Sequence, residues 1–392
     1  MRPKMLTIQC GIMVILLTLQ DVHSFRWLGI NSTEVNQSQV EDLRRYLCSS
    51  SPRASRNKLL DKEQKKICRK KIRMMKYVVI AAELAKTECL RLTKYERWDC
   101  KAVLQLPKFS KDLRAGTREA AFLHALSSAA LVFAITQGCT TDGVCDCGRE
   151  PGLSLLQSYR RKHGSDRYTY AWRGCHDNIA IATRFSKDFL DRREVKKTKS
   201  VPRKVLNLHN NDLGRKVVRD SLVLDCKCHG ITAQCTKRYC RRILTIEFPK
   251  VSKKIFAAYK NAMQVKLKKT SSTKMELIPK RKKFRRPGEL AKSMTYLYRS
   301  RDFCSYDRRN KLPGTSGRTC GHKYEYPSSQ TSSKRAIVDR LLVSKCKMLC
   351  CGRGHQTVLE NVKIKCRCKF DFRIMDVRCK TCTARKNTYV CN

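Results

Sequence analysis

The stretch from Cys226 to Cys240 reads Cys-Lys-Cys-His-Gly-Ile-Thr-Ala-Gln-Cys-Thr-Lys-Arg-Tyr-Cys. Its four cysteines bracket a six-residue tip that contains a glycine and one hydroxyl side chain, that of Thr232. A pairing of Cys228 with Cys235 inside a pairing of Cys226 with Cys240 would close a hairpin twice at its base. Closing a loop of this size contributes about 3 kcal/mol in the chain-entropy model. The stretch therefore predicts a rigid hairpin that presents Thr232.

The N-terminus has the features of a secretory signal peptide. A short charged start precedes an apolar run over residues 5–19. The small residues Val22 and Ser24 suit a cleavage site, so we expect residues 1–24 to be removed and the mature chain to begin at Phe25. The alternative, an N-terminal membrane anchor, is disfavoured because a spanning helix needs ~20 apolar residues. We therefore predict a protein secreted into the extracellular space and matrix.

The cysteine content agrees with secretion. The chain has 23 cysteines, and removal of Cys10 with the signal leaves 22, an even number suited to disulfides in an oxidising compartment. Zinc sites need Cys-x-x-Cys pairs or histidines at ligand spacing, and Cys379-Lys-Thr-Cys382 is the one match. The Cys-x-Cys pairs favour strand-linked disulfides instead. We expect neither a metal nor a cofactor.

Two further features limit the chemistry of the chain. The sequence shows no Ser/His/Asp constellation and no base beside Thr232, so we expect no enzymatic activity and no catalytic residues. Two sequons, at Asn31 and Asn36, follow the signal in a polar stretch and predict N-glycosylation of both asparagines.

Net charge points to a polyanionic partner. The formal charge is +52, from 85 basic and 33 acidic residues. For a secreted chain the expected polyanion is the sulfated glycosaminoglycan of heparan sulfate proteoglycans, not nucleic acid, although a merely soluble basic surface is the alternative. The charge is concentrated in residues 266–286, with Arg192–Lys204 similar in composition. The predicted heparin-binding residues are Lys280, Arg281, Lys282, Lys283, Arg285 and Arg286.

The length of the chain predicts more than one domain. We expect a helical N-terminal domain over residues 25–265, a basic linker over 266–292, and a cystine-rich C-terminal domain over 293–392. A buried core helix is expected to begin after Thr117 and to stop at Gly138. Further helices are expected over residues 179–189 and around residues 255–263, and short hairpins in the C-terminal domain. The predicted fold class is α+β.

An ordered series of motifs along the chain resembles the Wnt family of secreted signalling proteins. The motifs that carry the resemblance, beside the Cys226–Cys240 stretch, are Arg97-Trp-Asp-Cys100, Gly116-Thr-Arg-Glu119, Trp172-Arg-Gly-Cys175, Leu208-His-Asn-Asn211, Gly314-Thr-Ser-Gly-Arg-Thr-Cys320, Leu349-Cys-Cys-Gly-Arg-Gly354 and Cys366-Arg-Cys-Lys-Phe370. Each motif is weak alone, but their common order over nearly the whole mature chain is very specific.

The resemblance implies a ligand for Frizzled receptors that acts in developmental cell–cell signalling. In the family, two projections grip the Frizzled cysteine-rich domain: an acylated "thumb" hairpin, here residues 226–240, and a C-terminal "finger" loop, here residues 368–379. It also implies a low-density-lipoprotein-receptor-related co-receptor, and a membrane O-acyltransferase and a Wnt carrier during secretion. Thr232 stands in the place of the acylated serine and is the implied lipid acceptor. The implied receptor contacts are Ile231, Thr232, Phe370, Phe372, Ile374, Met375 and Val377.

The resemblance also implies a pattern of disulfides. The implied pairs are Cys89–Cys100, Cys139–Cys145, Cys147–Cys175, Cys226–Cys240, Cys228–Cys235, Cys304–Cys351, Cys320–Cys346, Cys350–Cys391, Cys366–Cys382 and Cys368–Cys379. These pairs leave Cys48 and Cys68, which we expect to pair with each other.

The chain departs from the family pattern at both tips. Thr232-Ala-Gln stands where the family usually has Ser-Gly-Ser, and the extra methyl of threonine crowds its hydroxyl. Arg241 replaces an aromatic residue, and the finger lacks the family's adjacent cysteine pair. Apolar residues on an exposed tip indicate a binding site, whereas the alternative is that they fold back onto the domain.

Three classes of function stay open at this point. The first is a lipid-modified Wnt ligand for Frizzled. The second is an unlipidated Wnt-like ligand, bound to heparan sulfate, that uses another receptor or acts as a competitor. The third is a heparin-binding matrix protein with no signalling role.

Overall fold

The computed structural model describes residues 21–31, 40–49, 59–106, 113, 116–163, 169–198, 200–229, 237–270, 275–281, 288–308, 312–325, 342–372 and 375–392. The chain divides into two compact units. The helical unit comprises Met1–Cys89 and Lys101–Ser300, and the cystine-rich unit comprises Leu90–Cys100 and Arg301–Asn392. This mainly helical unit and disulfide-rich β unit confirm the predicted α+β class.

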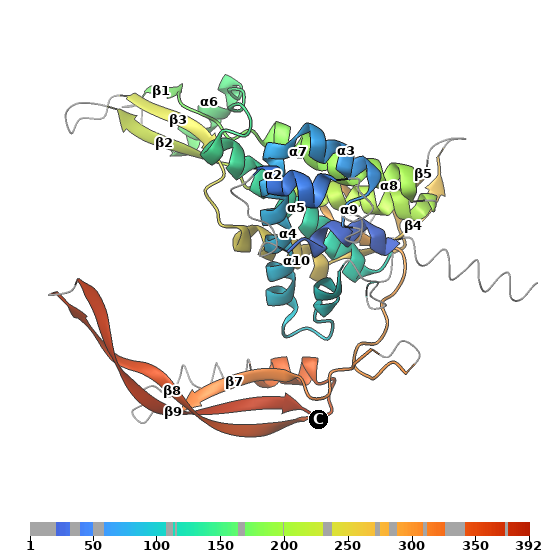
Figure 1. Ribbon diagram of the computed structural model, residues 1–392, viewed down its shortest axis with the longest axis vertical. Coiled ribbons are helices and arrows are strands. Elements are labelled where there is room, and N and C mark those ends of the chain that lie inside the picture. Colours follow the sequence, from blue (N-terminus) through green and yellow to red (C-terminus); the bar gives the residue numbers. More distant parts are fainter. Residues whose placement is uncertain are drawn as a thin grey trace, which may run out of the picture. The chain divides into compact units, whose positions relative to one another are not determined.

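Helices form most of the helical unit (Figure 1). The α-helices are α2 (Val40–Leu43), α3 (Lys62–Lys70), α4 (Ile72–Thr93), α5 (Arg118–Asp142), α6 (Leu153–His163), α7 (Ile179–Ser186), α8 (Arg192–Lys197), α9 (Val201–Arg219) and α10 (Phe248–Lys260). Short 3-10 or π turns are η1 (Asp21–Gly29), η3 (Arg44–Cys48), η5 (Lys101–Gln105), η6 (Lys187–Asp191) and η8 (Leu290–Lys292).

Helix α5 is the expected core helix. Thr117 caps it by accepting a hydrogen bond from the N–H of Ala120 at 3.4 Å. Its length and composition would allow it to cross a membrane, but its apolar window is fully buried within the fold. The predicted stop at Gly138 is wrong: the helix continues to Asp142 and ends at Gly143, whose φ is +57°. Gly138 is instead a packing position, because a Cβ there would lie 2.4 Å from the ring of Tyr77.

Helix α9 packs against α5 through residues of the Leu208–Arg215 region. A Cβ on Gly214 would lie 2.0 Å from the carbonyl oxygen of Ala125, so the two backbones meet at this glycine. Asn211 lies 3.1 Å from the Nδ1 atom of His124, and its carbonyl accepts a hydrogen bond from Ser128 at 2.8 Å. The structure thus places His124 in the core as a hydrogen-bonded residue.

The region expected to be a basic linker is largely a folded part of the helical unit. Strands β4 (Met263–Lys269) and β5 (Met275–Pro279) pair antiparallel, and β4 also pairs in parallel with β6 (Thr295–Tyr296). Met263, Val265 and Leu277 are buried in a cluster with Leu206 of α9. The linker prediction over 266–292 is therefore wrong for the part of this region that lies in β4 and β5, because buried Leu277 anchors it while Lys266, Lys268 and Lys269 are exposed. Likewise, α10 ends at Lys260, and Met263 belongs to β4.

The cystine-rich unit contains one long hairpin instead of the short hairpins that we expected. Strands β8 (His355–Asp371) and β9 (Asp376–Cys391) pair antiparallel, and β7 (Thr319–Glu325) pairs with the other edge of β9, as Figure 1 shows. At the base of the hairpin, Leu349 is buried among Cys320, Cys346, Cys350 and Cys391. Cystines therefore supply much of this small core.

Disulfides join segments within both units. The structure contains the pairs Cys48–Cys68, Cys139–Cys145, Cys147–Cys175, Cys226–Cys240, Cys304–Cys351, Cys320–Cys346, Cys350–Cys391, Cys366–Cys382 and Cys368–Cys379. Cys89, Cys100 and Cys228 are disulfide-bonded as well. Cys235, the implied partner of Cys228, lies outside the described residues.

Candidate functional site

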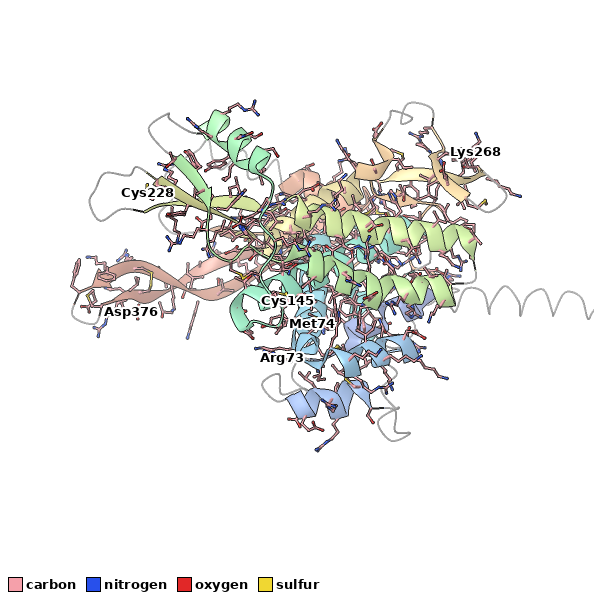
Figure 2. All side chains as sticks on the ribbon, turned by 90° about the horizontal axis from the view of Figure 1, so that it is seen from above. Arg73, Met74, Cys145, Cys228, Lys268 and Asp376 are labelled. Carbon is pink, nitrogen blue, oxygen red and sulfur yellow. A yellow bond between two sulfur atoms is a disulfide. The ribbon has the colours of Figure 1, made fainter. Side chains whose placement is uncertain are left out.

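The thumb hairpin rises from a three-stranded sheet. Strands β2 (Val223–His229) and β3 (Lys237–Ile243) pair antiparallel, with Cys226 directly opposite Cys240. Strand β1 (Thr169–Trp172) adds to the other edge of β3 in parallel, and Figure 1 shows the three strands side by side. Figure 2 labels Cys228 on this hairpin. The base of the thumb is thus a covalently closed sheet, whereas its tip with Ile231 and Thr232 lies outside the described residues.

A loop after β1 anchors the thumb to the helical unit. The N–H of Arg242 donates to Nδ1 of His176 at 2.9 Å, and the N–H of Leu244 donates to a carboxylate oxygen of Asp177 at 2.6 Å. Burial lowers the pKa of His176, which favours the neutral imidazole that this contact requires. The sequence did not single out His176 for this role. The available signal was its place directly after the Trp172–Cys175 motif.

Arg241, which departs from the family pattern, has a local partner. It lies opposite Asp225 in the β2–β3 register, and its Nε atom is 3.1 Å from a carboxylate oxygen of Asp225. Beside it, the guanidinium of Arg173 lies 4.9 Å from the ring centroid of Tyr239. Arg241 thus forms a cross-strand ion pair at the thumb base.

The finger is the end of the β8–β9 hairpin, which Figure 2 marks at Asp376. The Cys368–Cys379 disulfide closes it near the tip, and Cys366–Cys382 closes it again further down. Phe370 lies opposite Val377 in the strand register, and Asp371 lies opposite Asp376. Between Cys366 and Lys369 the register shifts, and Arg367 has a positive φ of 47°. The departure from the family's cysteine pattern thus leaves a tip that is still held by two bridges.

The apolar side chains of the finger tip are exposed. Phe372 is 79% exposed and Met375 is 73% exposed, while Phe370 and Val377 are each about half exposed. The rings of Phe370 and Phe372 meet edge to face, with centroids 4.9 Å apart. Among the described tip residues, these side chains do not fold back onto the unit. Ile374 lies outside the described residues.

The predicted heparin-binding and glycosylation residues are only partly described. Lys280 and Arg281 are exposed at the end of β5, while Lys282, Lys283, Arg285 and Arg286 lie outside the described residues. Lys266, Lys268 and Lys269 of β4 are exposed nearby in sequence, and Figure 2 labels Lys268 at the edge of the unit. Asn31 is partly buried, and Asn36 lies outside the described residues.

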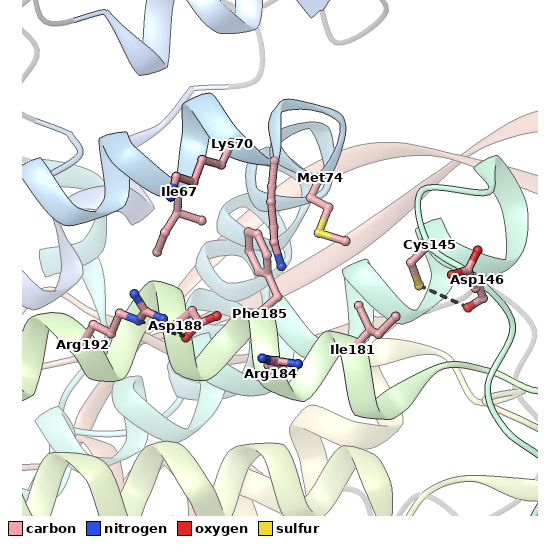
Figure 3. A pocket seen from close by; sticks show the side chains of 11 residues that line it. Ile67, Lys70, Met74, Cys145, Asp146, Ile181, Arg184, Phe185, Asp188 and Arg192 are labelled. Carbon is pink, nitrogen blue, oxygen red and sulfur yellow. Dashed lines mark hydrogen bonds and ion pairs between the residues drawn. The ribbon is translucent and has the colours of Figure 1, made fainter.

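A groove on the helical unit was missed by sequence reasoning, because its residues come from separate segments (Figure 3). It encloses about 490 Å³ between an apolar floor and a charged rim. The ammonium of Lys71 lies 5.8 Å from the ring centroid of Phe185, and Arg192 is paired with Asp188 at 2.9 Å. The floor is formed by Ile67, Met74, Ile181 and Phe185, and the basic rim residues are Lys70, Lys71, Arg184 and Arg192.

Comparisons with known proteins show which family this chain resembles in sequence and structure. A family model described as the wnt family matches residues 56–392. Protein Wnt-11 of Xenopus laevis is 31% identical over 331 residues, which cover 84% of this chain and 85% of that protein. Protein Wnt-16 of Bos taurus is 30% identical and covers 94% of this chain and 92% of that protein. A chain in the solved structure of human WLS in complex with WNT8A is 27% identical, with a TM-score of 0.52, over 81% of this chain and 94% of that chain.

Proposed function

We propose, because this chain belongs to the Wnt family, that it is a secreted ligand for Frizzled receptors in developmental cell–cell signalling. The family membership itself makes the chain a Wnt signalling ligand. The proposal adds the mode of binding: an acyl chain on Thr232 of the thumb and the apolar tip of the finger each engage the Frizzled cysteine-rich domain.

The exposed finger tip is the observation that carries the proposal. Phe372 and Met375 are large apolar residues that stand almost fully in solvent at the end of a doubly bridged hairpin. Large apolar side chains exposed together at a hairpin tip indicate a surface that a binding partner covers. Because the disulfides hold the tip before binding, little conformational entropy is lost when the partner covers it. The tip is therefore built as an anchor for an apolar groove.

The thumb supports the second contact. Its base is fixed by the Cys226–Cys240 disulfide and by the parallel contact of β1 with β3. A rigid base suits a hairpin whose tip segment carries Thr232, the proposed acceptor of an acyl group from a membrane O-acyltransferase. Each methylene of an acyl chain that becomes buried contributes about 0.8 kcal/mol. A lipid would therefore supply most of the binding energy at the thumb.

Further partners follow from the same family relationship and from charge. We include a low-density-lipoprotein-receptor-related co-receptor, and a carrier during secretion, since the similar WNT8A is in complex with WLS. Heparan sulfate proteoglycans are proposed to bind the exposed cations at the end of β5, beginning with Lys280 and Arg281. The net charge of +52 favours this association at long range.

Binding to an isolated Frizzled cysteine-rich domain tests the proposal. We expect the secreted full chain to bind saturably, and the Thr232→Val chain, which keeps a branched side chain but loses the hydroxyl, to bind more weakly by at least tenfold, about 1.4 kcal/mol. Thr232→Ser is the matched control, and it should bind as the wild type does. Equal binding of the wild type and the Thr232→Val chain would contradict a lipid-dependent thumb.

An unlipidated ligand is the second candidate function. It is favoured by the Thr232-Ala-Gln tip, because the threonine methyl crowds the acyl-accepting oxygen. In that case the finger and heparan sulfate carry the binding, and the chain uses another receptor or competes with acylated ligands. The intact mass of the secreted protein separates the two candidates through the presence or absence of an acyl group.

A further inference from the structure

Glu194 of α8 is a buried acidic residue that the proposed receptor binding does not use. Its side chain is only 2% exposed. One carboxylate oxygen accepts hydrogen bonds from Thr198 and from Asn207, both at 2.8 Å. The other oxygen, Oε1, accepts a hydrogen bond from the hydroxyl of Ser24. All three of these donors are neutral.

Arg193, a cation beside Glu194, also has other partners. Arg193 comes no closer than 3.9 Å to the carboxylate, whereas its Nε atom is 2.8 Å from a carboxylate oxygen of Asp61. Arg193 also donates to the hydroxyl of Ser24 at 2.9 Å. Burial lowers the pKa of His124, which favours its neutral form. Burial alone would raise the pKa of Glu194, but the hydrogen bonds from Asn207 and Ser24 and the nearby charge of Arg193 lower it, so the carboxylate is ionised.

The segment beside this carboxylate is the expected start of the mature chain. From Ser24 onward the side chains enter the core: Phe25, Trp27 and Leu28 are each at most 3% exposed. The ring of Phe25 lies 4.5 Å from that of His124. The residue on which the sequence places the end of the signal peptide is thus the residue that hydrogen bonds to Glu194.

Cleavage between Ser24 and Phe25 changes the groups at this position. A secretory-pathway protease hydrolyses the peptide bond with one water molecule, so Ser24 leaves with a carboxylate and Phe25 keeps a protonated amino group. The hydroxyl of Ser24 is lost at the same time. Glu194 would then have one buried carboxylate oxygen without its donor, which is costly unless another donor replaces it.

We propose that the α-ammonium group of Phe25, formed by signal-peptide cleavage, takes the place of the Ser24 hydroxyl and forms a buried ion pair with Glu194. The Phe25 nitrogen is bonded directly to the carbonyl carbon of Ser24, whose hydroxyl contacts Glu194, so the ammonium of a mature chain that keeps Phe25 in this core position lies beside the carboxylate. A cavity of about 10 Å³ lined by Ser24, Phe25, His124 and Glu194 leaves room for its adjustment. Maturation thereby completes the core of the helical unit. The inference requires secretory cleavage but not receptor binding.

The first test uses the wild-type secreted chain. Mass spectrometry of the N-terminal peptide should show a mature chain that begins at Phe25. Its α-amine should react with cyanate at neutral pH at least about tenfold more slowly in the folded protein than in the reduced, unfolded protein. The ion pair raises the pKa of the amine, and a rise of one pKa unit removes about nine-tenths of the reactive free amine. A start at another residue, or equal rates in the two states, would overturn the proposal.

The second test uses matched variants. Glu194→Gln keeps the size and the hydrogen-bonding capacity of the side chain but removes its charge, so the reaction of the Phe25 amine should approach the rate of the unfolded chain. Glu83→Gln is the control, because Glu83 is half exposed and paired with Lys86 on α4. It should leave the rate unchanged. If Glu194→Gln is not secreted, the ratio of the cyanate reaction rates in the folded and unfolded wild type still tests the ion pair.

Discussion

At the scale of single residues, the exposed side chains of the finger tip allow the most specific prediction about binding. Phe372 contacts the ring of Phe370 and is otherwise mostly in solvent, so its removal should not unfold the unit. We predict that Phe372→Ala weakens binding to the Frizzled cysteine-rich domain by about 1–3 kcal/mol, as expected for an aromatic anchor. Leu359→Ala, an exposed apolar change on the same hairpin but away from the tip, is the control. Loss of secretion with unchanged affinity would assign Phe372 to the fold.

The finger also shows how far residue types alone determine a site. The apolar character of Phe370, Phe372 and Met375 could be read directly from the sequence. The sequence leaves open whether they stay exposed or fold back, because that depends on the register in which Phe370 opposes Val377 and on the positive φ of Met375. Composition encodes neither feature.

At the scale of elements, the contact of α5 with α9 depends on Gly214. The same residue type has other roles at Gly138, which packs against Tyr77, and at Gly143, which ends α5. The sequence could not separate these roles because each depends on which helix lies opposite. Similarly, the sequence predicts a linker from Lys266 onward because lysines dominate there, and this charge hides that the segment continues a strand whose first half buries Met263 and Val265.

We predict that Gly214→Ala destabilises the helical unit. A Cβ at this position would lie 2.0 Å from the Ala125 carbonyl oxygen and 2.3 Å from the Ser128 hydroxyl, so the helices must separate. Overpacking of this kind costs about 1–3 kcal/mol, and the backbone contact places it at the upper end. Thermal unfolding measures the change. Gly152→Ala, whose Cβ would meet only the Ser154 hydroxyl at 3.7 Å, should unfold at nearly the wild-type temperature.

Buried histidines make the stability of the helical unit depend on pH. Burial lowers the pKa of His124, His176 and His209. Below the ordinary histidine pKa of about 6.5, these histidines bind protons in the unfolded chain but not in the folded chain. Their contribution to the free energy of unfolding is therefore fully present above that pH and is lost as the pH falls. We predict a lower melting temperature at pH 5.5 than at pH 7.5. His176→Gln should flatten this dependence, and replacement of the exposed His355 by Gln should not.

At the scale of the whole molecule, sequence reasoning foresaw a helical unit followed by a cystine-rich one. It misplaced the boundary, because β4, β5 and β6 belong to the helical unit, which extends to Ser300. The family resemblance supplied the cysteine pairs, which spacing alone leaves open among many connectivities. The clustering of charge predicts that the polyanionic partner binds at residues 280–286, but exposed cations also line the rim of the groove in Figure 3 and form a second basic surface.

A heparin column distinguishes these two basic surfaces. We predict that replacing Lys280–Lys283 by Ser or Gln moves elution to lower salt, because fewer counterions are released when fewer cations contact the polymer. A variant with Lys70, Lys71 and Arg184 replaced by Gln should elute near the wild-type position. If only the groove variant elutes early, the end of β5 is not the heparin site.

The central claim is that an acylated thumb and an apolar finger together bind Frizzled. The most direct measurement is the native mass of the complex between the secreted full chain and a Frizzled cysteine-rich domain. We predict a one-to-one complex whose ligand, after release, carries a single fatty acyl group on the peptide that contains Thr232. A complex formed by unacylated chain, or the absence of any complex with acylated chain, would contradict it.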